Sequence, residues 1–445
     1  MIPPMPNLYF LPAVFLVACW LSLPGALAEA YLELGPMLGH VSSTEARIWA
    51  KASGKSTLAM RLGEREDLRD GRVIKGPVLN ARADFMGQVV VPNLKPSTRY
   101  FYSVLLDGRP VTLRPYASFV TAPTNGAPVK LRFAFVSCVG KNGYDAAAAY
   151  ADLAARTNVD LLLMLGDNHY ADSTDPAKQR AAYYDQRRQA GYRALTELTP
   201  TYAIWDDHDY GPNDSDGSAV GKEISLRTFQ QFWANPAYGQ LNDPGVHFRF
   251  SRGSIDFFML DNRYHRSTNS APDDGTKTML GTEQLAWFKR ELVASKAKVK
   301  FVASGSSWQT HGTRDSWASF DRERQEIWKF IKDHEINGVI FLSGDRHFTA
   351  GYQVRGRFIE VTSGPIGSGN ARTKNMPEMF LHYNEGKLYC VFDVDTTGLD
   401  PKVALEVYRV GQGLIERRAF TWDEINGIAK IPALPPSPEE PGKAQ

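Results

Sequence analysis

The chain has 445 residues, with 51 lysines and arginines against 49 aspartates and glutamates, so its formal net charge is only +2. This length exceeds what one hydrophobic core usually supports and predicts two or three domains. Basic and acidic residues are interspersed, and this balance gives no signal for binding nucleic acid or an anionic membrane surface.

The first 28 residues predict a secretory signal peptide. They contain no Asp, Glu, Lys or Arg, carry an apolar run from Phe10 to Leu23 and end in the small-x-small pattern Ala26-Leu27-Ala28. A basic n-region and a twin-arginine pair are missing. Leu16-Val-Ala-Cys19 resembles a lipoprotein lipobox, which would lipidate Cys19, but the apolar run continues past Cys19 and favours cleavage after Ala28. An uncleaved anchor is the third alternative, although the run is shorter than the roughly 20 residues of a span. We expect a periplasmic or secreted protein with no transmembrane span in its mature form.

Residues 30–122 predict an all-β domain. Short runs rich in β-branched and aromatic residues alternate with turns, and Asp107-Gly108 is a strong hairpin signal. The strand-like runs are Tyr31 to Leu38, Ala46 to Ala52, Leu58 to Leu62, Gln88 to Val91 and Arg99 to Leu106. The segment from Leu94 to Tyr102 resembles the tyrosine corner of fibronectin-type-III-like sandwiches. We therefore predict an Ig/fibronectin-III-like sandwich with a structural or positioning role.

After a Pro- and Gly-containing linker at residues 121–128, residues 130–428 predict an α/β domain. Apolar strand-like runs alternate with helical stretches. The runs are Leu131 to Val136, Leu161 to Leu165, Thr201 to Trp205, Ile255 to Leu260, Val299 to Ala303, Val339 to Leu342 and Phe358 to Val361. The helical stretches are Tyr144 to Arg156, Pro176 to Leu198, Lys222 to Trp233, Glu283 to Ser295 (with Thr282 as N-cap) and Arg322 to Asp333. The Pro-rich tail, 432–445, is expected to be disordered.

Acids, a cysteine and histidines follow five of these apolar runs. They are Ser137-Cys138, Gly166-Asp167, Asp206-Asp207-His208, Asp261-Asn262-Arg263 and Gly344-Asp345-Arg346-His347. Open α/β sheets place their chemistry at the carboxyl ends of strands. Clustered carboxylates raise each other's pKa, a conflict that a bound cation removes, and imidazole completes a mixed oxygen and nitrogen ligand set. The sequence therefore predicts a metal site at this edge.

Several of these residues have plainer interpretations. Asp167 alone could cap a helix, and a buried cysteine such as Cys138 is most often a small hydrophobe or, outside the cytosol, half of a disulfide with Cys390. A thiolate ligand at Cys138 would favour iron or zinc, and a phenolate from Tyr170 beside it would suit ferric iron. His169 is interpreted as structural. The Gly-rich segment 364–370 fits neither a dinucleotide fingerprint nor a P-loop, which indicates a loop.

Six motifs occur in the order found in the PhoD-type alkaline phosphatases, a branch of the calcineurin-like metallophosphoesterases, and the chain resembles that family over residues 130 to about 425. They are Ser137-Cys138, Gly166-Asp-Asn-His-Tyr170, Trp205-Asp-Asp-His-Asp209, Met259-Leu-Asp-Asn-Arg263, Met279 to Trp287 and Ser343-Gly-Asp-Arg-His347. The resemblance implies a β-sandwich flanked by helices, with the N-terminal domain belonging to the same family.

The resemblance also implies a ferric ion with calcium alongside. It assigns the iron to Cys138 and Tyr170, a metal-bridging role to Asp167, and further ligand roles to Asp207, Asp345 and His347. His208 would face the phosphate, and Arg263 could clamp phosphate oxygens. The superfamily's Asp-x-His is replaced here by Ser137-Cys138, and its histidine after the strand ending at Ala303 is replaced by Ser304 to Gln309.

The expected function is that of a secreted, metal-dependent phosphoric ester hydrolase, an alkaline phosphatase or phosphodiesterase that uses a metal-activated water.

 We expect it to act as a monomer on a phosphate mono- or diester substrate. Two alternatives stay open: a phospholipase D-like phosphodiesterase that keeps the same site, and a non-catalytic secreted binding protein whose sandwich recognises a surface polymer. Metal-dependent turnover of an aryl phosphate distinguishes the enzymes from the binding protein.

Overall fold

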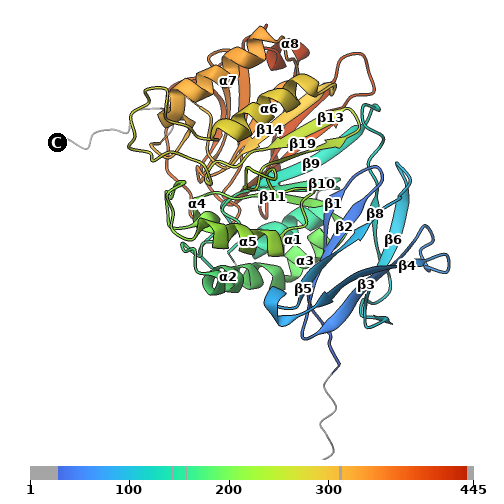
Figure 1. Cartoon of the computed structure of the whole chain (residues 1–445). Helices are drawn as coiled ribbons and strands as arrows, with labels where there is room; N and C mark the ends of the chain where they lie inside the picture. The colour runs from blue at the N-terminus through green and yellow to red at the C-terminus, as the bar shows by residue number, and fades with distance from the viewer. Residues whose placement is uncertain (1–28, 143–144, 157, 310–312, 438–445) are drawn as a thin grey trace, which may run out of the picture.

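The computed structural model describes residues 29–142, 145–156, 158–309 and 313–437. The expected signal peptide, with Cys19, lies outside these residues. The described chain forms an N-terminal β-sandwich packed against the side of a larger α/β domain (Figure 1). None of its described helices is both long and apolar enough to cross a membrane.

The N-terminal domain contains two antiparallel sheets that enclose their own apolar core. One sheet has the order β1 (Leu32–Val41), β2 (Ala46–Ala52) and β5 (Met86–Val91). The other has the order β4 (Arg72–Leu79), β3 (Ser56–Gly63), β6 (Arg99–Leu106) and β7 (Arg109–Pro110), with β8 (Ala117–Val120) also paired to β6. A 3-10 turn, Ala81–Ala83, precedes β5. The hydroxyl of Tyr100 accepts a hydrogen bond from the Lys95 amide at 3.0 Å, the kind of contact that the tyrosine-corner pattern predicts.

The α/β domain contains two large sheets. The six-stranded sheet has the order β11 (Thr201–Ile204), β10 (Leu161–Leu165), β9 (Lys130–Val136), β19 (Leu388–Asp395), β20 (Lys402–Arg409) and β21 (Gly413–Phe420). The seven-stranded sheet has the order β12 (Phe248–Arg252), β13 (Ile255–Met259), β14 (Val299–Ser304), β15 (Val339–Ser343), β17 (Phe358–Thr362), β16 (Thr349–Val354) and β18 (Met379–Tyr383). Strands β9 to β11 are mutually parallel, as are β13, β14, β15 and β17.

The two sheets face each other across an aromatic core. The Phe133 ring of β9 lies 5.1 Å from Phe257 of β13 and 4.7 Å from Phe301 of β14, measured between ring centroids. Successive residues of a strand point to opposite faces of the sheet. Val302, next to Phe301, therefore belongs to a second hydrophobic cluster, which this sheet forms with residues of α6 and α7. Strands β10, β11, β13, β14, β15 and β17 are buried on both faces, which explains their continuous apolar runs.

Helices cover the outer faces of this pair of sheets (Figure 1). On the seven-stranded sheet lie α6 (Thr282–Ala294), α7 (Asp321–Asp333) and α8 (Trp422–Ile425), with a 3-10 turn at Trp317–Phe320. On the other side, next to the sandwich, lie α1 (Ala147–Arg156), α2 (Pro176–Arg188), α3 (Ala190–Leu198) and α5 (Lys222–Phe232). A single turn of helix, α4 (Asp207–Tyr210), follows β11.

Three local features differ from the sequence-based expectations. The single helix expected from Pro176 to Leu198 is divided at Gln189, whose backbone is extended at φ −65° and ψ 129°. Gly281 rather than Thr282 occupies the N-cap of α6. The described part of the C-terminal tail contacts an edge strand, because the Leu434 amide donates to the Met379 carbonyl at 2.6 Å. Residues 432–437 therefore have defined contacts where disorder was expected.

Candidate metal centre and active site

Five loops that follow parallel strands carry the candidate residues. Those after β9, β10 and β11 come from one sheet, and those after β13 and β15 come from the other. Because parallel strands end at a common edge, the loops gather at one edge of the two facing sheets of the α/β domain. The structure therefore brings residues from distant parts of the sequence to the site that the recurrence of polar strand ends predicted.

The backbone of this site is unusual at four of the expected ligands. Cys138, Asp167, Asp345 and His347 have φ values of 61°, 52°, 68° and 54°, in the left-handed region that residues other than glycine rarely adopt. Each such conformation costs of order 1–3 kcal/mol and persists where the surrounding structure or a function requires it. The strained positions thus coincide with the residues that the motifs identified.

Three expected ligands form one compact group. A sulfur of Cys138, a carboxylate oxygen of Asp167 and a ring nitrogen of His347 lie within 4.8 Å of one another. The Tyr170 hydroxyl donates to Asp167 Oδ2 at 2.9 Å and lies 3.2 Å from His347 Nε2. Cys138 and Cys390 are both free thiols, so the disulfide considered from the sequence is not formed.

Asp167 also belongs to a second group, with Asp207 and His208, whose ligand atoms again lie within 4.8 Å of one another. Its membership of both groups suits the expected bridging role. Asp167 Oδ1 and Asp207 Oδ1 are buried and have no hydrogen-bond partner among the described residues, although the Arg263 guanidinium lies 3.7 Å from Asp207 Oδ1. Buried carboxylate oxygens are normally paired, so these two atoms fit a site that receives a cation.

The electrostatics of the first group point the same way. Burial, and then the charge of Asp167, raises the pKa of the Cys138 thiol and of the Tyr170 phenol well above their usual values. Burial, and then the Asp207 carboxylate, raises the pKa of Asp167 in the same direction. A bound cation reverses these shifts because it stabilises the deprotonated forms. The donor set of thiol, phenol, carboxylates and imidazole therefore fits a metal centre.

Asp345 lies near this centre but outside both groups of ligand atoms. Burial, followed by the charge of Asp206, raises its pKa well above the usual value. A third group, formed by Asp207, Asp214 and Asp315 within the same 4.8 Å, extends the acidic region on the other side. Asp214 and Asp315 were not among the residues predicted from the sequence, because neither follows a predicted strand.

His208 is held in a defined orientation. Its ring stacks on Tyr170 with 4.0 Å between centroids and an interplanar angle of 30°, and its Nδ1 contacts the Asp172 carboxylate. A carboxylate at Nδ1 fixes the tautomer and leaves Nε2 as the nitrogen available to a substrate. Asp172 was not assigned a role from the sequence, although it lies only five residues after Asp167 in the same segment.

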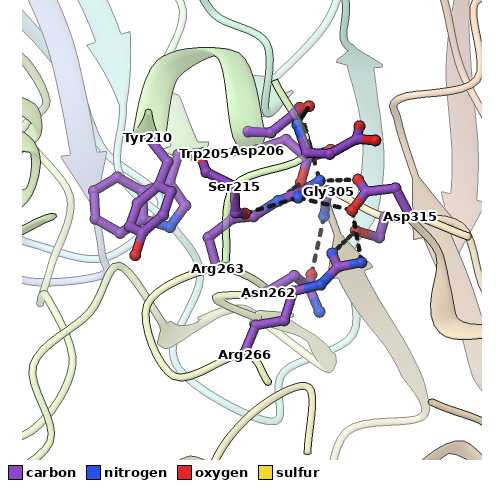
Figure 2. A network of polar contacts seen from close by, with 12 residues as sticks. Trp205, Asp206, Tyr210, Ser215, Asn262, Arg263, Arg266, Gly305 and Asp315 are labelled. Carbon is purple, nitrogen blue, oxygen red and sulfur yellow. Dashed lines mark hydrogen bonds and ion pairs between the residues drawn. The ribbon is translucent and has the colours of Figure 1, made fainter. Parts of the chain in front are cut away.

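Arg263 is placed differently from the expected phosphate clamp (Figure 2). Its guanidinium is fully buried and donates to Asp206 Oδ1 at 2.6 Å, to Asp315 at 2.6 and 3.1 Å, and to the Ser215 carbonyl at 3.1 Å. Arg266 reaches the same Asp315 at 2.7 Å. These contacts occupy the donors that a phosphate would need, so the geometry supports a positioning role for Arg263 in place of direct substrate binding.

Glycines allow the loops to approach this centre closely. The amides of Gly367 and Ser368 both donate to the Cys138 carbonyl, at 3.1 and 3.0 Å, and the Ser368 hydroxyl donates to Tyr170 at 2.9 Å. A Cβ at Gly367 would lie 1.8 Å from the Val139 carbonyl oxygen. The Gly-rich segment 364–370 is thus a supporting loop of the site, in agreement with the interpretation as a loop.

His169 lies behind the centre in an aromatic environment. Its ring meets Tyr183 edge-on at 4.3 Å, and burial, followed by the nearby Arg187, lowers its pKa to about 3. The adjacent Asn168 donates to the Ile204 carbonyl at 2.8 Å and also contacts Asp209. These contacts fit the structural role expected of His169.

The two facing sheets, with candidate metal ligands in the loops at one edge, have the fold of a metallophosphoesterase. A solved structure described as PhoD superposes with a TM-score of 0.69 at 19% identity, covering 86% of this chain and 91% of that one. The purple acid phosphatase PPD1 from yellow lupin seeds superposes with a TM-score of 0.65 at 13% identity, covering 92% and 78%. Residues 133–394 match the PhoD-like phosphatase family, and the chain belongs to that family.

Two curated relatives agree with this assignment. The chain is 26% identical over 313 residues to alkaline phosphatase D of Bacillus subtilis, covering 58% of this chain and 52% of the relative. It is 23% identical over 310 residues to purple acid phosphatase 23 of Arabidopsis thaliana, covering 65% and 62%. The chain thus spans about half to three fifths of the length of these relatives. Residues 29–124 match a domain of unknown function (DUF7800). The family and the fold class expected from the motifs are confirmed.

Proposed function

We propose that the protein is an exported, metal-dependent phosphoric ester hydrolase of the alkaline phosphatase D type. Its family membership supports this class of enzyme, and the observation that carries it is the convergence of Cys138, Asp167, Tyr170 and His347 in one group. Export rests on the composition of residues 1–28.

The proposed metals are a ferric ion and calcium. Cys138 and Tyr170 would hold the iron, because thiolate and phenolate ligands suit ferric iron better than calcium. Asp167 would serve both metals, and Asp207 would contribute carboxylate oxygens, which calcium prefers. Asp345 and His347 complete the proposed ligand set. When bound, such metals supply Lewis-acid activation of the phosphoryl group and of a water molecule.

The protein's own groups position the substrate and handle the proton. His208, oriented by Asp172 and by its stacking on Tyr170, would donate a proton from Nε2 to the leaving oxygen or stabilise charge on the phosphate. Arg263 would act through Asp206 and Asp315, by fixing the loops that carry Asp207. The buried walls around Asp167 exclude water, which strengthens these electrostatic interactions.

Steady-state hydrolysis of 4-nitrophenyl phosphate and bis(4-nitrophenyl) phosphate by the metal-loaded protein tests the proposal. We expect metal-dependent turnover and, in His208→Gln, a decrease in kcat of about a hundredfold or more with metal content unchanged. His334→Gln, at the exposed end of α7, is the matched control. A preference for the diester would support the phosphodiesterase alternative. Absence of turnover of both esters by protein with a full metal complement would support the binding-protein alternative.

A further inference from the structure

A cavity of about 310 Å³ lies between the N-terminal sandwich and the α/β domain, at the opposite end of the sheet from the metal centre. It is bordered by residues 158–160 before β10 and by residues 199–200 before β11, whereas the candidate ligands follow the other ends of these strands. At about 3.3 Å per residue, the five residues of β10 separate the two places by roughly 16 Å. The cavity is therefore distinct from the active site.

A buried arginine lines this cavity and forms no ion pair with the described residues. Arg252 is only 5% exposed, and its Nη1 donates to the Val41 carbonyl at 3.1 Å. Its Nε has no hydrogen-bond partner among the described residues, and their carboxylates form no ion pair with its guanidinium. The Asp160 carboxylate interacts with it electrostatically from beyond ion-pair distance. A buried, unpaired charge is unfavourable unless another group compensates it. An anion in the adjacent cavity would provide that compensation.

The rest of the polar lining is also biased towards an anion. Arg99, from the sandwich, lines the opposite side, and its guanidinium donates to the Ser118 hydroxyl at 3.2 Å. The one acidic residue of the lining is Asp160, and its Oδ2 already accepts the Arg132 amide at 2.8 Å. Two guanidinium groups against one carboxylate leave the cavity positive.

The remaining wall is apolar and partly open. Leu195 and Phe119 are buried there, whereas Val120 and Leu198 are 39% and 53% exposed. A volume of about 310 Å³ lies at the lower end of the range for small-molecule sites and exceeds what a bare inorganic anion fills. An organic ligand with both an anionic group and an apolar body matches this combination.

We propose that this interdomain cavity binds a small organic anion whose carboxylate or phosphate group pairs with Arg252 and Arg99 and whose apolar body lies against Leu198 and Val120. The ligand would contact both domains at once. Its binding is independent of the proposed hydrolytic activity, because no lining residue belongs to the metal centre.

The test is calorimetric titration of the full-length, metal-loaded protein with 4-bromobenzoate, 4-bromophenylphosphonate and the neutral 4-bromobenzamide. We expect at least one anion to bind and the amide to bind much more weakly. Because a charge-assisted hydrogen bond is lost, Arg99→Gln should weaken anion binding about tenfold or more. Arg193→Gln, on α3 but outside the lining, should leave it unchanged. The relative affinities of the two anions tell a carboxylate ligand from a phosphate ligand.

Arg252→Gln should weaken anion binding more than Arg99→Gln does. If substitution of the buried Arg252 prevents folding, the exposed Arg99→Gln variant alone decides the test. A crystal grown with the tighter anion should show anomalous bromine density beside Leu198. The proposal is overturned if neither anion binds, if the amide binds as tightly, if Arg99→Gln binds like Arg193→Gln, or if the bromine lies at the metal centre.

Discussion

Replacing Arg263 with methionine removes the cation at the centre of the buried network in Figure 2. Asp315 keeps Arg266 at 2.7 Å, whereas Asp206 loses the one cation that the described residues place within ion-pair distance of it. The pKa of the buried Asp206 is about 6 with Arg263 present, and it would rise further without it. Breaking a buried ion pair costs about 3–5 kcal/mol. Protonation of Asp206 relieves part of this, so we expect a loss of about 3 kcal/mol in unfolding free energy.

Urea unfolding at pH 7.5 measures this loss from the midpoint, provided that the denaturant slope is unchanged. In a double-mutant cycle, Arg263→Met with Asp206→Asn should show a coupling of about 2 kcal/mol. Arg156→Met removes the exposed partner of an ion pair with Asp152, whose carboxylate keeps its hydrogen bonds from Tyr389 and Gly411, and should change stability by less than about 0.5 kcal/mol. A stability loss below about 1 kcal/mol, together with a tenfold or larger rise in KM, would refute this reasoning and restore Arg263 as a direct phosphate ligand.

Three further predictions concern other contacts. Asp172→Asn should lower kcat about 10- to 100-fold without loss of metal, because the His208 ring loses its orienting carboxylate. Steady-state kinetics combined with elemental analysis of the variant measures both quantities, and a loss of bound metal would contradict the prediction. Gly367→Ala forces a Cβ into the neighbouring backbone and should lower both stability and iron content. Gly369→Ala, whose Cβ would have no atom within 4 Å, should change neither. Equal effects of the two substitutions in thermal unfolding would contradict the close packing at Gly367. Burial lowers the pKa of His40 from its usual value of about 6.5 to about 3. Between these two values the unfolded chain binds a proton that the folded protein does not, so stability falls as the pH drops from 6.5 towards 3. His40→Gln should therefore remove about 2 kcal/mol of the decrease in stability between pH 7 and pH 5, and unchanged pH dependence in urea unfolding would disprove this.

The sequence predicted much of the α/β framework because strands buried on both faces are continuous apolar runs. Leu161–Leu165 is the clearest case, and its boundaries agree with those of β10. Strands β18 to β21 and the break between α2 and α3 at Gln189 were not predicted. We attribute this to tertiary contacts, which local periodicity does not record. The tail shows the same limit, since its Pro-rich composition gives no indication that Leu434 contacts an edge strand.

The candidate site was predictable where residue type and strand ends coincide, as at Cys138 and Asp167. It was not predictable where a partner lies far along the chain. The Ser368 hydroxyl reaches Tyr170 across 198 residues, and no local pattern marks that serine. Arg263 illustrates the same limit: its type and position suit a phosphate clamp, and only the location of Asp315, 52 residues later, shows how its donors are used.

The thiolate and phenolate ligands of the proposed centre are tested most directly by the metal content and visible spectrum of protein purified without added metal. We predict bound iron with a visible charge-transfer band, accompanied by calcium. The band should disappear in Tyr170→Phe and change in Cys138→Ser, while Tyr31→Phe, whose side chain is exposed, should retain it. Zinc as the only bound metal, or a band that persists in Tyr170→Phe, would contradict the proposed ligand set.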